Sequence, residues 1–202
     1  MFVAHCILNE NTRYPGGAFC KGPVDEIVDE LQKNGIGIVQ MSCPEQRAWG
    51  GVLKKYMWLP FGLKNSLLFK LRGALVPIFI WHTKRIFQKL ADQTALEIKD
   101  YSRSGFEVMG VWGIDGSPSC GVNQAVDVEK FVGLLASADM EGFDRDKMNQ
   151  MVKGCLAAGS GYYIQALKQA LKKENLSVKL FAHDLIKEMD GKKTAKEALS
   201  GE

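Results

Sequence analysis

The first 41 residues limit the fold more than any other part of the chain. Two short apolar runs, Phe2–Ile7 and Ile36–Met41, flank a stretch with helical spacing. Pro23 and the acidic residues after it suit the start of a helix and Gly35 suits its end, so we expect a helix over 23–34. A strand, a helix and a second strand favour parallel pairing with a right-handed crossover. The sequence therefore predicts an α/β fold built on a mainly parallel sheet.

The remainder of the chain continues this alternation of strands and helices. Further helices are expected over 84–100, from Asp127 onward, over 144–156 and over 162–173, and further strands over 106–114 and 178–182. We expect a single Rossmann-like domain over 1–185, with helices flanking the sheet, and a charged tail over 186–202.

The composition is that of a globular protein in a reducing compartment. The chain has 202 residues, of which 46% are hydrophobic and 24% charged. Its five cysteines are an odd number, which excludes a fully paired disulfide framework and favours the cytoplasm. The N-terminal apolar run has no basic leader, so no signal peptide is expected. The longest uncharged run in the apolar middle, 73–83, falls short of the roughly 20 residues that span a bilayer, so no transmembrane segment is expected either.

Three of the five cysteines stand where a predicted strand ends. Cys6, Cys43 and Cys120 are each followed by loop-forming residues. The carboxyl ends of parallel strands meet at one edge of a sheet, so three thiolates can converge there on a metal. Their spacing is too wide for a zinc ribbon or a ferredoxin motif, and free cysteines are also common in protein cores. The pattern alone is compatible with a metal site and with three structural cysteines. For Cys20 and Cys155 we expect a structural role.

Four short blocks of sequence resemble a known family. They are Cys6-Ile7-Leu8 with Arg13-Tyr14-Pro15-Gly16-Gly17, then Cys43-Pro44-Glu45, then Gly116-Ser117-Pro118-Ser119-Cys120-Gly121, and finally Gly159-Ser160-Gly161-Tyr162. In order and separation these blocks are similar to those of the thiouracil desulfidase family, over about 1–50 and 92–182.

The resemblance implies a cofactor and an activity. In this reading Cys6, Cys43 and Cys120 ligate three irons of an oxygen-sensitive [4Fe-4S] cluster, and the fourth iron stays open to act as a Lewis acid. The expected reaction removes sulfur from a small thiolated substrate, such as a thiolated pyrimidine, and gives the oxo product and sulfide.

Replacing a C=S sulfur by oxygen also requires an activated water and a proton donor. The resemblance assigns these duties to Glu45 and Ser117, although a helix-capping carboxylate and a turn-stabilising hydroxyl are the plain alternatives. Arg13 suits an anionic substrate or a structural hydrogen bond equally well. The family has glycine near Asn9 and an acid where Pro15 stands, so the substrate contacts of this first loop stay open.

A segment rich in basic and aromatic residues, about 46–91, follows the second predicted strand as an insertion. It contains no acid between Gln46 and Ala91 and holds nine basic residues: Arg47, Lys54, Lys55, Lys64, Lys70, Arg72, Lys84, Arg85 and Lys89. Its aromatic residues are Trp49, Tyr56, Trp58, Phe61, Phe69, Phe79, Trp81 and Phe87. Such a mixture suits nucleic acid, including a thiolated nucleotide or tRNA base, and also a lid, a homodimer surface or an anionic membrane. We favour a lid or an interface.

Three other functions fit the same residues. The site can belong to an iron–sulfur protein that carries sulfur or senses redox state. It can belong to a zinc-thiolate hydrolase, in which water completes a tetrahedral site. An RNA-binding module with purely structural cysteines is the last of these readings.

Overall fold

A four-stranded sheet lies at the centre of the protein, of which the computed structural model describes residues 1–14, 16–58, 70–137 and 144–191. Its strands are β1 (Phe2–Val3), β2 (Val39–Gln40), β3 (Val111–Asp115) and β6 (Leu180–Asp184). They stand in the order β2-β1-β3-β6, and every neighbouring pair is parallel. The predicted α/β fold with a mainly parallel sheet is thus confirmed.

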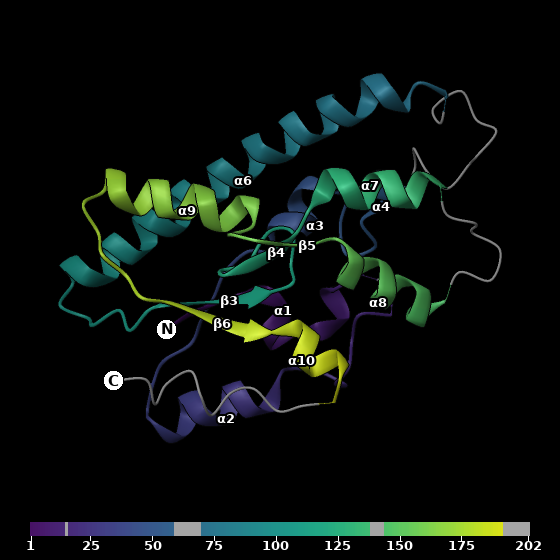
Figure 1. Cartoon of the computed structure of the whole chain (residues 1–202). Helices are drawn as coiled ribbons and strands as arrows, with labels where there is room; N and C mark the ends of the chain where they lie inside the picture. The colour runs from purple at the N-terminus through teal and green to yellow at the C-terminus, as the bar shows by residue number, and fades with distance from the viewer. Residues whose placement is uncertain (15, 59–69, 138–143, 192–202) are drawn as a thin grey trace.

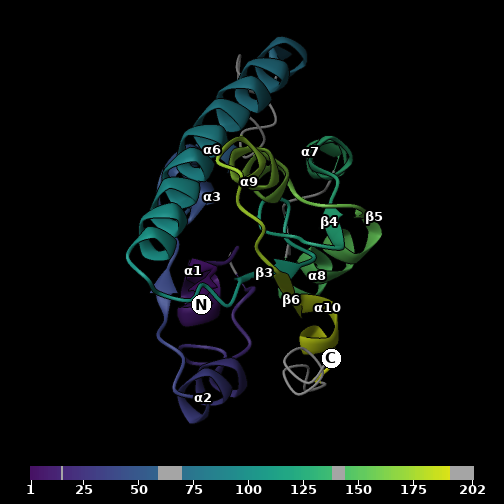
Figure 2. The same ribbon diagram turned by 90° about the vertical axis from the view of Figure 1, so that its left-hand side faces the viewer.

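Helices cover both faces of this sheet. The helix α2 (Asp25–Lys33) lies on one side, whereas α6 (Arg72–Arg103) and α9 (Tyr162–Lys173) lie together on the other (Figures 1 and 2). The bounds of α9 are those predicted. The arrangement is Rossmann-like, with a crossover helix between each pair of successive parallel strands.

The helix α6 begins earlier than predicted because Gly73 and Pro77 obscure its start in the sequence. Pro77 lies inside the helix, where it removes one backbone hydrogen bond. The helix tolerates this loss because its second half is anchored in the core by Phe87, Ala91 and Ile98, which are all fully or almost fully buried.

A smaller layer beside the sheet combines two helices, which were expected from Asp127 onward and over 144–156, with a strand pair that was not predicted. It consists of an antiparallel pair, β4 (Gln124–Val126) and β5 (Leu156–Ala158), with the helices α7 (Val128–Ser137) and α8 (Arg145–Gly154). A second apolar cluster, separate from the main core, lies between them. Strands of three residues are too short to reveal an alternating pattern, so no periodicity predicts this pair.

The first strand is shorter than the predicted run Phe2–Ile7. Ala4 still donates its N–H to the carbonyl of Trp112, at 2.9 Å, but the chain then turns into the short helix α1 (His5–Leu8). Ile7 is completely buried in this helical turn. A short apolar run does not distinguish a buried strand from a buried helical turn, which explains the error.

Four short elements complete the described structure: η1 (Glu10–Thr12), α3 (Pro44–Ala48), α4 (Lys55–Trp58) and α10 (Leu185–Met189). The predicted charged tail begins within α10, and its last part, 192–202, lies outside the described residues. Across the described ranges, no helix combines the length and apolar character needed to cross a membrane.

Candidate functional site

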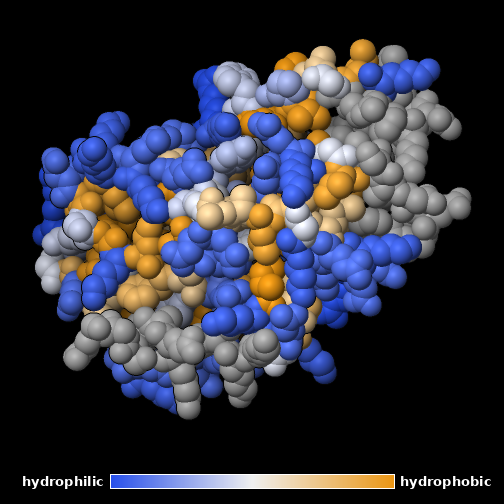
Figure 3. Space-filling model, in the orientation of Figure 1, coloured by the Kyte–Doolittle hydropathy of each residue, from blue (hydrophilic) through white to orange (hydrophobic). Residues whose placement is uncertain are grey.

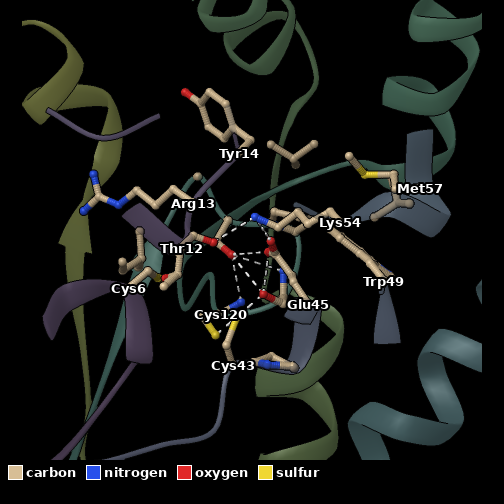
Figure 4. A pocket seen from close by; sticks show the side chains of 18 of the residues that line it. Cys6, Thr12, Arg13, Tyr14, Cys43, Glu45, Trp49, Lys54, Met57 and Cys120 are labelled. Carbon is tan, nitrogen blue, oxygen red and sulfur yellow. Dashed lines mark hydrogen bonds and ion pairs between the residues drawn. The ribbon is translucent and has the colours of Figure 1, made fainter. Parts of the chain in front are cut away.

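The three strand-end cysteines lie around one pocket at the carboxyl edge of the sheet. Cys6 belongs to α1 after β1, Cys43 precedes α3 after β2, and Cys120 lies in the loop after β3. The strand order reverses between β1 and β3, and such a reversal opens a crevice where α/β proteins bind ligands. Figure 4 shows Cys43 and Cys120 close together below Glu45, with Cys6 to one side.

Burial keeps these thiols protonated when no metal is present. It raises the pKa of Cys43 to about 12 and that of Cys120 well above its ordinary value. Burial also raises the pKa of Cys6, against the opposing field of Arg13. None of the five cysteines is in a disulfide. Three neutral thiols facing one pocket form a soft donor set, which a metal would bind by displacing their protons.

The loop that carries Cys120 is held by Asp115 at the end of β3. The carboxylate of Asp115 accepts the backbone N–H groups of Val122 and Asn123, at 2.8 and 2.9 Å. The loop then turns back toward β3, where the carbonyl oxygen of Cys120 accepts a hydrogen bond from the N–H of Ile114 at 2.9 Å. A Cβ on Gly113 would stand 2.4 Å from that carbonyl oxygen, so only glycine allows this close return.

Glu45 connects this loop with the first turn of α3. Its Oε1 accepts a hydrogen bond from Ser119 Oγ at 2.8 Å and a longer one from Ser117 Oγ at 3.3 Å. Ser117 Oγ in turn accepts the N–H of Cys120 at 3.1 Å, and Ser119 Oγ lies 3.6 Å from Cys120 Sγ. A carboxylate, two hydroxyls and a cysteine sulfur therefore form one continuous polar chain beside the pocket.

Lys54 places a positive charge in the same network. Its side chain is only 1% exposed, and its Nζ lies 3.1 Å from Glu45 Oε2 and 3.1 Å from the carbonyl oxygen of Thr12 (Figure 4). Its backbone is left-handed, with φ of 49°, a conformation that few residues other than glycine adopt. A buried lysine requires such pairing, because an unpaired buried ammonium costs several kcal/mol.

The pocket opens to the surface beside the cysteines. It encloses about 930 Å³ of space when the open solvent at its mouth is included. Polar residues outside the polar chain, His5, Thr12, Arg13, Tyr14 and Lys54, also line the pocket. Its apolar wall residues include Trp49, Met57, Phe79, Val126, Val128, Phe131, Val132, Val152 and Leu185. These walls suit a flat, weakly polar ring more than a highly charged ligand.

Arg13 lines the pocket, but its guanidinium turns away from Glu45 (Figure 4). Its Nη1 lies 3.0 Å from both carboxylate oxygens of Glu188 and 3.3 Å from Glu10 Oε2. Burial and a side-chain hydrogen bond with Glu188 raise the pKa of Glu10. The pKa of Glu188 is held at about 2, because hydrogen bonds with His183 and Glu10 and the charge of Arg13 outweigh its burial. Arg13 thus has a structural partner, and its contact with an anionic substrate stays a prediction.

The insertion supplies part of the pocket wall. Trp49 and Phe79 face the pocket, and Trp49 Nε1 donates to Thr83 Oγ1 in α6 at 3.0 Å. Further along the insertion, Ile78 and Trp81 are each about 60% exposed, and apolar surface is visible along the upper part of α6 (Figure 3). The nucleic-acid, lid, membrane and homodimer readings of this segment remain predictions, and its residues 59–69 lie outside the described structure.

Comparison with known proteins adds one partial relative. A segment of 43 residues is 44% identical to the uncharacterized protein MJ0003 of Methanocaldococcus jannaschii, and the match spans 21% of this chain and 28% of that protein. No protein-family profile and no solved structure matches the chain. The structure and the chemistry of its residues are therefore the basis for a functional proposal.

Sequence reasoning missed two polar members of the site. Ser119 belongs to the block that contains Ser117, yet Ser119 makes the shorter hydrogen bond to Glu45. Lys54 was counted only among the basic residues of the insertion. No local sequence pattern identifies a lysine whose side chain pairs with a carboxylate at the end of a strand, so the role of Lys54 could not be predicted from the sequence.

Proposed function

We propose that this protein is a [4Fe-4S]-dependent desulfidase that removes sulfur from a thiolated pyrimidine or a related thio-compound. The observation that carries the proposal is the convergence of Cys6, Cys43 and Cys120 on one apolar pocket beside Glu45. An enzyme of this kind requires a cluster, a place for the substrate and a proton-transfer group in a single cavity.

The donor set fits an iron–sulfur cluster. The three thiols come from three separate elements, are free of disulfides and face one pocket. With three protein ligands, one iron of a bound [4Fe-4S] cluster has no thiolate and supplies a Lewis acid for the sulfur of the substrate. Free thiols and an oxygen-sensitive cluster also fit the reducing cytoplasm, where we propose that the protein acts.

The spacing of the three cysteines weighs against a single zinc ion. Tetrahedral zinc holds its thiolate sulfurs roughly 3.8 Å apart. Among the described residues, the group of three potential ligands whose donor atoms all lie within 4.8 Å of one another is Glu10, Cys20 and Glu188, not the pocket cysteines. A multinuclear cluster binds each thiolate to a different metal atom, so it accommodates the wider spacing.

Glu45 is the group best placed to move protons. The net reaction converts C=S and water into C=O and hydrogen sulfide, so the oxygen of water replaces the sulfur and both of its protons leave with that sulfur. Glu45 takes the first proton from the attacking water and returns it to the departing sulfur. Ser119 and Lys54 orient its two oxygens, at 2.8 and 3.1 Å.

The apolar walls support a flat heterocyclic substrate. Trp49, Phe79 and Phe131 present aromatic surface to the pocket, which suits stacking or edge contacts with a pyrimidine ring. The same walls exclude bulk water, which strengthens the interaction between Glu45 and the groups around it. A pocket beside the cysteines favours catalysis over the sulfur-carrier and redox-sensor alternatives.

The test is anaerobic purification followed by iron, sulfide and absorption analysis. We expect broad absorption near about 400 nm and roughly four irons and four sulfides per chain. Cys43→Ser should lose the chromophore, whereas Cys155→Ser, which alters a buried cysteine outside the pocket, should keep it. The loaded protein should then release sulfide from 2-thiouracil.

The possible failures separate the rival functions. A colourless protein after anaerobic reconstitution would refute the cluster, and bound zinc would instead support a hydrolase. A full cluster without sulfide release from any of a panel of thiopyrimidines would refute the desulfidase and support an iron–sulfur carrier or sensor.

A further inference from the structure

A second group of potential metal ligands lies outside the pocket and is independent of the proposed function. It comprises Glu10 in η1, Cys20 in the following loop and Glu188 in α10, and one ligand atom from each lies within 4.8 Å of the other two. These residues come from distant parts of the chain, so the fold itself assembles the group. We propose that Glu10, Cys20 and Glu188 bind a divalent transition-metal ion, with zinc as the best match.

The carboxylate of Glu10 supplies the observation that points to a ligand. Glu10 is fully buried, and its Oε2 accepts the backbone N–H groups of Phe19 and Cys20 at 2.6 and 2.8 Å. Among the described residues, its Oε1 is buried and has no hydrogen-bond partner. A buried carboxylate oxygen is rarely left without a partner, and a cation bound at Oε1 would satisfy it.

Charge balance favours a divalent ion at this place. The two carboxylates face one permanent cation, Arg13, whose Nη1 contacts Glu188 at 3.0 Å and Glu10 Oε2 at 3.3 Å. Metal binding displaces the proton of the Cys20 thiol and any proton shared by Glu10 and Glu188, so the bound group carries three negative charges. Arg13 and one divalent ion together supply three positive charges, so the occupied site is neutral.

The chemical types of the three ligands favour zinc over magnesium and calcium. One sulfur and two carboxylate oxygens are a mixed set, which borderline-soft zinc accepts and which magnesium and calcium, with their preference for oxygen, do not. His183 Nε2 lies 2.6 Å from Glu188 Oε2, and contacts of this kind hold a ligating carboxylate in place. Cys20 is exposed, so the ion can enter from solvent and water can complete the tetrahedral coordination.

Such an ion would join the first loop to the C-terminal helix. Glu10 and Cys20 lie on either side of the turn that contains Arg13, and Glu188 belongs to α10, which follows β6 directly. A bound ion would hold this turn against α10. Thr12 and Tyr14 of the same turn line the pocket.

The experiment measures cobalt and zinc uptake by the purified full-length chain. The matched variants are Cys20→Ser and Cys155→Ser, each of which removes one cysteine outside the pocket. We expect the native chain and Cys155→Ser to take up about one equivalent more of either metal than Cys20→Ser. The cobalt difference spectrum should contain a thiolate charge-transfer band in the near ultraviolet, and zinc should raise the thermal midpoint of the native chain more than that of Cys20→Ser.

Equal uptake by the native chain and Cys20→Ser would overturn the proposal. Glu10→Gln provides a second check, because the amide keeps an acceptor for the N–H groups of Phe19 and Cys20 but binds zinc poorly. Its zinc affinity should fall by more than the roughly 10–100-fold typical of an outer-shell change, and unchanged affinity would also refute the site. All pocket cysteines are present in these variants, so iron content tests the proposed function separately.

Discussion

Two polar clusters lie on either side of the turn formed by residues 10–14, and they balance their charges differently. In the inner cluster, beside the pocket, one carboxylate (Glu45) pairs with one ammonium (Lys54) at 3.1 Å. In the outer cluster two carboxylates, Glu10 and Glu188, share the guanidinium of Arg13. Both contain or adjoin a cysteine, and both are largely buried.

The difference in charge balance suggests a different chemistry for each cluster. In the balanced pair, Lys54 and Ser119 hold the two carboxylate oxygens of Glu45 in place, as a proton-transfer group requires. In the outer cluster, one carboxylate oxygen of Glu10 has no hydrogen-bond partner among the described residues, and this is where we propose a further cation. The same residue types therefore support different proposals, acid–base chemistry for Glu45 and cation binding for Glu10.

The largest expected effect is a loss of activity when Glu45, the carboxylate of the inner cluster, is replaced. Glu45→Gln should keep the cluster, because it alters no cysteine, and should lower the rate of sulfide release by roughly 10²–10⁴-fold, the usual contribution of a general acid–base group. Iron analysis and a sulfide assay measure the two quantities on one sample. Glu129→Gln, an exposed carboxylate on α7, is the matched control. Undiminished turnover in Glu45→Gln would remove Glu45 from the mechanism.

The next effect is on stability, through the outer cation. Arg13→Met removes the guanidinium shared by buried Glu10 and half-buried Glu188, so the free energy of unfolding should fall by about 5 kcal/mol, at the upper end for a broken buried pair. Urea denaturation of the chain without added metal measures this. A loss no larger than that of the exposed control Lys153→Met would contradict the balance inferred for the outer cluster.

Lys54→Met should cost less, about 3 kcal/mol, because one carboxylate rather than two loses its cation. The double variant Lys54→Met with Glu45→Gln should recover part of this loss, since no uncompensated charge remains. The same denaturation experiment applies. If Lys54→Met proved more costly than Arg13→Met, the comparison between the clusters would be wrong.

The smallest effect concerns Tyr14, in the turn between the clusters. Its hydroxyl donates to Asn149 Oδ1 at 2.7 Å, so Tyr14→Phe should lower the free energy of unfolding by about 1 kcal/mol at neutral pH. Burial raises the pKa of Tyr14 to about 12, above its unfolded value near 10.

The sign of this shift sets the pH dependence. A group whose pKa is raised on folding contributes its stability fully below the unfolded pKa and loses it as pH rises toward the folded pKa. The stability difference between native chain and Tyr14→Phe should therefore shrink between about pH 10 and pH 12. Denaturation at pH 9 and at intervals above it measures the trend, and a constant difference would contradict it.

Much of the fold was predictable because it depends on local patterns. The helix α9 begins and ends where its apolar spacing and the Gly159–Gly161 break place it. The order of strands and helices followed from their alternation. The bounds of α6 could not be predicted, since Pro77 is typical of a helix boundary. Packing of Phe79 and Thr83 against Trp49, together with the buried second half, stabilises the helix across Pro77.

The sequence by itself determined that Cys6, Cys43 and Cys120 follow three parallel strands, and parallel strands deliver their ends to one edge of a sheet for reasons of chain direction. The tertiary structure decided the partners around them. Lys54 meets Glu45, and Glu188 meets Glu10 and Arg13, through contacts between residues far apart in the chain. Such contacts depend on how whole elements pack, and no periodicity of single residues encodes them.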